Sequence, residues 1–170
     1  IKQADVLQGM YFFEDDFSLE DLERNYNFYE PITVHESSLS PCVHSMLAAK
    51  LGKEDKSYEF YTRAARLDLD DYNNDTEDGC HITSMAGTRM SIVECFGGMR
   101  VKNNRLSFSP KIPKQWNAYS FKINFRNQIL KVNVKQNETH FELDGTEMLD
   151  ILVNDKLINI QPNKLITVKS

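Results

Sequence analysis

Residues 80–100 hold the pattern in this sequence that best suits the binding of an anion. The small residues Ser84, Gly87 and Thr88 stand at the start of an apolar series with helical spacing. A small-residue turn at a helix N-terminus presents free backbone N–H groups at the positive end of the helix dipole, where phosphate can bind. His81 and Ser84 could donate further hydrogen bonds. The alternative is an ordinary loop-to-helix junction in which Gly87 allows close packing.

Two more pairs of residues could contact a ligand. Lys2 and Gln3 could hydrogen-bond a polyhydroxylated molecule, or they could be solvated side chains at a helix end. His35 and Glu36 place an imidazole beside a carboxylate on a predicted loop, which suits acid/base chemistry or ligand binding. A surface or capping role is the alternative for this pair. His44, inside the next predicted helix, is interpreted as a satisfied helix histidine.

The charges are unevenly distributed along the chain. Residues 1–105 hold 19 acidic and 11 basic side chains, a net charge of −8, whereas residues 106–170 hold 6 and 9, a net charge of +3. The contrast favours two structural units. Neither unit has the basic cluster that is typical of nucleic-acid-binding proteins, so we expect no nucleic-acid partner.

Cysteine usage and hydropathy limit the location of the protein. Three cysteines, Cys42, Cys80 and Cys95, form no CxxC pair and cannot all be bridged within one chain, which predicts a reducing, cytoplasmic compartment. No apolar stretch reaches the roughly 18 residues of a membrane span, and no signal-peptide pattern opens the chain. Because Ile1 begins inside an amphipathic pattern, we expect a piece of a longer protein.

The first hundred residues read as helices joined by short loops. Ser18 and Asp21 resemble a capping box ahead of a helix that ends at Pro31, and Ser40-Pro41 and Gly52 bound the next helix. Gly97 and Gly98 are expected to end the helix that follows His81. The acidic run 67–79 lacks the alternating ligands of an EF-hand and no metal-site spacing is present, so we predict a loop in which Asx side chains bond to local backbone.

After Arg105 the apolar period changes from helical to two. Alternating segments begin at Tyr119 and Leu130 and are followed by short runs at 139–143, 148–153, 157–160 and 165–169, with turn signals between them. This spacing predicts a small antiparallel β-sandwich. The fold class is therefore a two-part α + β chain, with helices over 1–105 and the sandwich over 106–170.

Several blocks of the sequence resemble glycoside hydrolase family 65, and within it the maltose phosphorylases. These blocks are IKQAD, FYEPITVHESSLSP, ARLDLDDYNNDTEDGCHITSMAGT and the GGMR that follows. Two positions depart from the family pattern, since Arg89 replaces a tryptophan and Cys95 lies where a glycine is common. The resemblance covers residues 1–105 most closely and implies the last helices of an (α/α)6 barrel followed by a β-sandwich.

The resemblance also implies an activity and a set of site residues. The reaction is phosphorolysis of maltose or a related α-glucoside with inversion, giving glucose 1-phosphate and glucose, with inorganic phosphate as co-substrate and no cofactor or metal. His81, Ser84, Gly87 and Thr88 match the phosphate-binding region. Lys2 and Gln3 match the glucosyl-binding pair, and we add His35 and Glu36 as substrate-binding candidates.

The family's general acid belongs to a region upstream of residue 1, so this chain alone is expected to be inactive. We also expect the full-length enzyme to be a homo-oligomer. Two other functions stay open: a trehalase-like hydrolase of the same family with Glu36 as general base, and a non-catalytic carbohydrate-binding module. In the second case Trp116, Tyr119 and Phe121 would present a sugar platform, although their alternation favours a core position.

Overall fold

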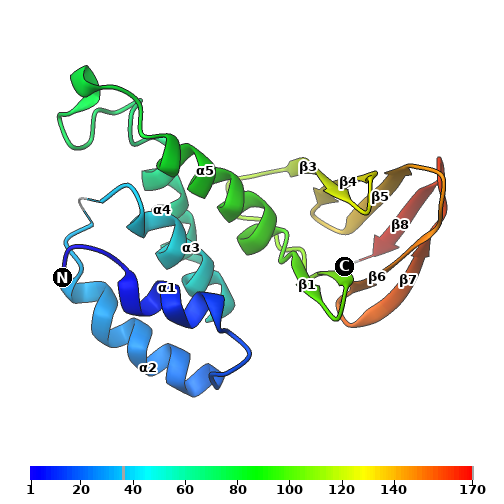
Figure 1. The fold of residues 1–170 in the computed structure, drawn as a ribbon, viewed down its shortest axis with the longest axis horizontal. Coiled ribbons are helices and arrows are strands. Elements are labelled where there is room, and N and C mark those ends of the chain that lie inside the picture. The colour runs from blue at the N-terminus through cyan, green and yellow to red at the C-terminus, as the bar shows by residue number, and fades with distance from the viewer. Residues whose placement is uncertain (36, 170) are drawn as a thin grey trace. The chain divides into compact units, whose positions relative to one another are not determined.

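Helices occupy the first part of the chain and strands the second. The computed structural model describes residues 1–35 and 37–169, so Glu36 lies outside the described residues. The chain divides into two compact units, Ile1–Ser91 and Ile92–Ser170, and Figure 1 labels most of their helices and strands. A helical part followed by a β-sandwich is the architecture that the sequence predicted.

The first unit contains the α-helices of the described residues. Ser18 caps α2, because its side-chain oxygen accepts a hydrogen bond from the N–H of Asp21. This confirms the capping signal in the sequence. The bounds are α1 Asp5–Phe12, α2 Leu19–Tyr29, α3 Ser40–Lys50, α4 Glu54–Ala65 and α5 Ile82–Met90, with short 3-10 turns at Glu30–Ile32 and Thr76–Asp78.

Helix α3 is the centre of the helical unit. It contacts α1, α2, α4 and α5, and every residue from Ser40 to Ala48 is buried. Pro41 lies in its first turn, where the missing N–H costs nothing. A helix that is buried all round needs apolar or hydrogen-bonded side chains on every face. Accordingly, Ser45 donates from its hydroxyl to the carbonyl of Ser57 on α4.

The second unit is built from two four-stranded sheets. One sheet has the order β1-β2-β6-β7 and the other β3-β4-β5-β8. All neighbouring pairs are antiparallel except β2 and β6, which run parallel. The strands are β1 Arg100–Lys102, β2 Arg105–Phe108, β3 Ala118–Phe125, β4 Gln128–Lys135, β5 Glu138–Asp144, β6 Leu149–Val153, β7 Lys156–Ile160 and β8 Leu165–Lys169.

Inward-facing residues of both sheets form one core. Phe108 and Ile151 come from the first sheet, and Leu130 and Phe141 from the second, and each is at most 1% exposed. Three hairpins turn at residue pairs with positive φ, Asn103-Asn104, Arg126-Asn127 and Asn154-Asp155, as two-residue hairpin turns require. Alternate burial along β4 confirms the period of two that the sequence showed.

The two units divide between Ser91 and Ile92, which is earlier in the chain than Arg105, the residue after which the apolar period changes. Residues Ser91–Phe96 continue the chain from α5 as a π-helical segment. Val93 of this segment is 1% exposed and belongs to the β core, so the segment packs with the strands. Gly98 ends it with φ of 57°, in agreement with the predicted stop.

Candidate functional site

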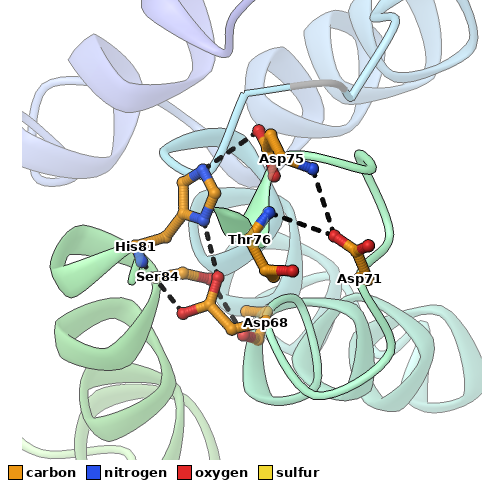
Figure 2. A network of polar contacts seen from close by, with 7 residues as sticks. Asp68, Asp71, Asp75, Thr76, His81 and Ser84 are labelled. Atoms are coloured by element: carbon orange, nitrogen blue, oxygen red, sulfur yellow. Dashed lines mark hydrogen bonds and ion pairs between the residues drawn. The ribbon is translucent and has the colours of Figure 1, made fainter. Parts of the chain in front are cut away.

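His81 is the N-cap residue of α5, and two aspartates hold its ring. Its Nδ1 donates to Oδ1 of Asp68 at 2.6 Å, and its backbone N–H donates to Oδ2 of the same residue at 2.9 Å. Nε2 lies 3.4 Å from Oδ2 of Asp75, as Figure 2 shows. The hydrogen bond to Asp68 raises the pKa of His81 above 6.5 and lowers the pKa of Asp68 below 3.8. The arrangement therefore favours an imidazolium.

The acidic loop that carries Asp75 is ordered by its own side chains. Oδ1 of Asp71 accepts hydrogen bonds from the N–H groups of Asp75 and Thr76, each at 3.1 Å. These bonds lower the pKa of Asp71, the largest contribution coming from the Thr76 N–H. The loop thus has the local Asx bonding that the sequence predicted. Within residues 1–35 and 37–169, no group of three or more His, Cys, Asp or Glu side chains is arranged to hold a metal ion.

The other three predicted phosphate residues lie inside α5 and not in a turn before it. Ser84 is 2% exposed, and its hydroxyl donates to the carbonyl of Ala64 on α4 at 2.8 Å. The hydroxyl of Thr88 donates to the carbonyl of Ser84. A Cβ on Gly87 would lie 2.7 Å from Cβ and Sγ of Cys42 on α3. Ser84 and Gly87 therefore fix α5 against α4 and α3, whereas the Thr88 hydrogen bond stays within α5.

The sequence predicted a row of free backbone N–H groups at the start of α5, but several of these groups are hydrogen-bonded to nearby carbonyls. The N–H of Ile82 donates to the carbonyl of Cys80, and those of Ser84 and Met85 donate to the carbonyl of His81. Because the helix begins at Ile82, the small residues follow its first turn and do not precede it. Of the four predicted phosphate residues, Ser84 and Gly87 are buried, whereas His81 and Thr88 are partly exposed. The side chain of His81 is 24% exposed.

The N-terminal segment lies along the loop that holds His35. The N–H of Val34 donates to the carbonyl of Ile1 at 2.9 Å, and the N–H of Ala4 donates to the hydroxyl of Ser40 at 3.1 Å. Lys2, which is exposed, and Gln3, which is half-buried, lie between these two contacts. The structure therefore brings three of the predicted substrate residues, Lys2, Gln3 and His35, into one neighbourhood.

The ring of His35 packs inside the helical unit. Its centroid lies 4.5 Å from that of His44 and 4.8 Å from that of Phe60. Both ring nitrogens are buried and have no hydrogen-bond partner among the described residues. Burial, followed by the charge of Arg63, lowers the pKa of His35 below 6.5. The backbone of His35 is left-handed, with φ of 58°, a conformation that costs a non-glycine residue on the order of 1 kcal/mol.

His44 has a larger part in this cluster than the sequence suggested. Its Nδ1 donates to the carbonyl of Ser40 at 3.0 Å, but its Nε2 is buried without a partner among the described residues. The hydroxyl of Tyr26, whose ring lies 6.0 Å from that of His44, is also unpartnered there. Burial lowers the pKa of His44 to about 4. His44 is thus neutral near pH 7 and only partly satisfied.

Arg63 on α4 contacts both loops of the candidate site. Its Nη2 donates to the carbonyl of His35 at 2.8 Å, and its guanidinium lies 5.0 Å from the ring centroid of Tyr72 in the acidic loop. Sequence reasoning did not single out Arg63, because one arginine on a charged helix has no distinguishing pattern. Asp68 and Asp75 could have been suspected, since a histidine directly after a run of acids tends to find a carboxylate.

The aromatic residues of the second unit pack on one another. Trp116 lies 5.2 Å from Phe96 and 5.7 Å from Tyr119, measured between ring centroids, and Tyr119 stacks on Phe121 at 6.3 Å. The hydroxyl of Tyr119 donates to the carbonyl of Lys111. Tyr119 and Phe121 are partly buried against the core. Their packing gives little support to the sugar platform considered from the sequence.

Comparison with known proteins identifies the family. Residues 1–90 match the central catalytic domain of glycosyl hydrolase family 65, and residues 99–160 match the C-terminal domain of the same family. The chain therefore belongs to glycosyl hydrolase family 65. This agrees with the resemblance seen in the sequence.

Individual relatives are named as phosphorylases of several disaccharides. The chain is 55% identical to maltose phosphorylase of Bacillus subtilis (strain 168), over 95% of this chain and 21% of the relative. It is 42% identical to alpha,alpha-trehalose phosphorylase of Thermoanaerobacter brockii, over 96% and 21%. A solved structure, a putative kojibiose phosphorylase from human microbiome, matches with a TM-score of 0.92 and 44% identity over 100% of this chain and 25% of that one. The chain spans about a fifth of the length of these curated relatives.

Proposed function

We propose that this chain is the C-terminal part of a disaccharide phosphorylase that cleaves maltose or a related α-glucoside with inorganic phosphate. A phosphate oxygen attacks the anomeric carbon, the glycosidic C–O bond breaks, and a carboxylic acid protonates the departing sugar oxygen. The products are glucose 1-phosphate of inverted configuration and glucose. The acid would lie in the part of the enzyme that precedes this chain, so residues 1–170 alone would be inactive.

The observation that carries this proposal is the geometry at His81. Its Nδ1 lies 2.6 Å from Oδ1 of Asp68, a contact that raises the pKa of His81, and its side chain is 24% exposed with Nε2 3.4 Å from Oδ2 of Asp75. In the proposed complex, phosphate replaces Asp75 as the partner of Nε2, and the imidazolium offsets part of the phosphate charge. Ser84 and Gly87 contribute by holding α5 against α4 and α3, and Thr88 contributes by a hydrogen bond within α5.

The sugar would be bound beside the phosphate, because a phosphate oxygen must reach the anomeric carbon. Lys2 and Gln3 are the proposed contacts to the glucosyl unit, and the loop that holds His35 is hydrogen-bonded to the same N-terminal segment through Val34 and Ile1. Glu36 is a further proposed contact that rests on the sequence alone. Maltose is the first substrate to test because the maltose phosphorylase relative is 55% identical, against 42% for the trehalose phosphorylase and 35% for a kojibiose phosphorylase.

The setting of the enzyme is part of the proposal. Cys42, Cys80 and Cys95 are all free thiols, as suits a cytoplasmic enzyme. None of the helices within the described residues is long and apolar enough to cross a membrane. We include a homo-oligomeric state as an expectation for the full-length protein, with disaccharide and phosphate as its ligands and no cofactor.

The decisive experiment incubates the full-length protein with maltose, trehalose or kojibiose, with and without inorganic phosphate. We expect glucose 1-phosphate to form from maltose only when phosphate is present, and its anomeric configuration can be read by NMR. Glucose formation without phosphate would support the family hydrolase with Glu36 as base instead. In the same assay His81→Asn should raise the KM for phosphate by about tenfold or more, as expected for loss of one charge-assisted hydrogen bond.

A further inference from the structure

We propose that Arg63 is a positioning residue of this site, and that its guanidinium holds the His35 loop and the acidic loop in fixed positions on α4. The proposal rests on the proposed phosphorylase function and adds a residue that acts without touching substrate. The His35 loop comprises the described residues 33–35 and 37–39, and the acidic loop comprises residues 67–79.

The contact with the His35 loop is made to backbone. Nη2 of Arg63 donates to the carbonyl of His35 at 2.8 Å, at the residue whose φ is 58°. A left-handed residue persists only where the surroundings determine it. Here those surroundings are the Arg63 hydrogen bond and the packing of the His35 ring between His44 and Phe60.

The His35 ring itself cannot serve as a direct ligand in this arrangement. Both of its nitrogens are inaccessible to solvent, because the ring is inserted between two other rings. His35 therefore contributes because its left-handed backbone conformation sets the path of the loop. That path depends on Arg63, whose hydrogen bond to the carbonyl joins His35 to α4.

The contact with the acidic loop is made to a ring. The Arg63 guanidinium lies 5.0 Å from the centroid of Tyr72, within the range of a cation–π interaction. Tyr72 stands between Asp68 and Asp75, the two residues that hold His81. The next residue of α4, Ala64, accepts the hydroxyl hydrogen bond of Ser84 on α5. One turn of α4 thus supports the sugar side and the phosphate side together.

The test compares Arg63→Ala with Arg24→Ala in the full-length enzyme. Arg24 lies on α2 and pairs with Asp21 on the surface, so it is a matched control whose ion pair involves neither loop. We expect Arg63→Ala to lower kcat/KM for the disaccharide by about a hundredfold, the effect of small displacements of reacting groups. Millimolar guanidinium should restore part of this loss, whereas urea should not. Arg24→Ala should retain wild-type kinetics.

Hydrogen exchange gives a readout that does not depend on activity. In Arg63→Ala, amides of residues 33–39 and 70–76 should exchange faster than in the wild type, while Tyr72→Leu should affect residues 70–76 alone. If Arg63→Ala does not fold, Arg63→Lys replaces it and should show smaller changes in the same direction. Wild-type kinetics and exchange in the Arg63 variants, or a loss of activity that guanidinium does not restore, would overturn the proposal. If the wild-type enzyme forms no glucose 1-phosphate, the proposed function fails, and hydrogen exchange still decides whether Arg63 fixes the loops.

Discussion

At the scale of single residues, His81 and Asp68 form a pair whose strength depends on pH. His81 has a folded pKa above 6.5, so its contribution is fully present below pH 6.5 and is lost as the pH rises through the raised value. Asp68 has a folded pKa below 3.8, so its contribution is present above pH 3.8 and is lost as the pH falls through the lowered value. The pair therefore stabilises the fold most between pH 3.8 and 6.5.

We predict that Asp68→Asn lowers the thermal midpoint most within this window and less once the pH has risen above the raised pKa of His81, where the imidazole has lost its charge. Thermal unfolding of the full-length protein as a function of pH measures the difference. Asp70→Asn is the matched control, because Asp70 pairs with Arg66, which keeps its charge throughout. The lowering of the thermal midpoint by Asp70→Asn should be the same at about pH 6 and pH 8. If the lowering by Asp68→Asn were equally independent of pH, the pairing of Asp68 with His81 would be contradicted.

A second prediction at the residue scale concerns His44, whose pKa is shifted in the opposite direction from that of His81. Its folded pKa of about 4 lies below the ordinary value of 6.5, so the neutral form is stabilising and this contribution is lost as the pH falls from 6.5 toward 4. One pKa unit corresponds to about 1.4 kcal/mol, so the loss approaches roughly 3 kcal/mol. His44→Leu should flatten the acid side of the stability profile, measured by urea unfolding. An equally steep profile in the variant would show that other groups cause it.

Some of the residue roles were accessible from sequence and some were not. His81 follows a dense acidic run, so a charged partner could be anticipated, but which aspartate pairs with it depends on how the loop folds. The roles of Ser84 and Gly87 differ from expectation because spacing alone could not decide whether the helix begins before or after them. The buried His35 ring and its bond to Arg63 depend on contacts across 28 positions of sequence, which no local pattern records.

At the scale of elements, the packing of α5 on α3 depends on the absence of a side chain at residue 87. A Cβ there would approach Cβ and Sγ of Cys42 to 2.7 Å, and overpacking of this kind costs about 1–3 kcal/mol. We predict that Gly87→Ala destabilises the protein by that amount and raises the KM for phosphate, because α5 must shift away from α3 with His81 at its start.

Gly9→Ala provides the matched comparison. Gly9 lies within α1, and no heavy atom lies within 4 Å of a Cβ built there. The same substitution should therefore stabilise the protein by about 0.5–1 kcal/mol through helix propensity. Chemical denaturation of both variants measures the contrast. Destabilisation of equal size in both would mean that the contact with Cys42 is not the cause.

Several element boundaries followed local chemical signals in the sequence. Ser18 caps α2 and Pro41 lies in the first turn of α3 as expected, but the N-cap of α3 is Leu39 and not Ser40. The first hairpin of the sheet β3-β4-β5-β8 turns at Arg126-Asn127, one residue before the expected Asn127-Gln128. Strands β1 and β2 were not expected, because three and four residues are too short to show alternation. The parallel pairing of β2 with β6 joins segments far apart in sequence, so it could not be read from either one.

At the scale of the whole molecule, the two units differ in how completely they bury their apolar residues. The β unit closes a core around Phe141, Leu143 and Ile151, each 0% exposed. The helical unit exposes large apolar side chains on several elements, among them Phe12, Phe13, Phe28, Leu69 and Ile82, each more than 60% exposed. Apolar surface of this extent favours association with other protein surface.

This contrast predicts different behaviour of the two units when each is expressed alone. Residues 91–170 should form a monomer that unfolds cooperatively, and Phe141→Ala should destabilise it by about 3–5 kcal/mol or prevent folding, because the fragment is small and its core is full. Residues 1–91 should associate, because their apolar side chains then remain in water. Sedimentation velocity and thermal unfolding of both fragments measure these properties. If the exposed apolar residues cause this association, replacing Phe12 and Phe13 by serine should reduce association of residues 1–91. A monomer of the unmodified fragment at high concentration would show that this apolar surface does not cause association.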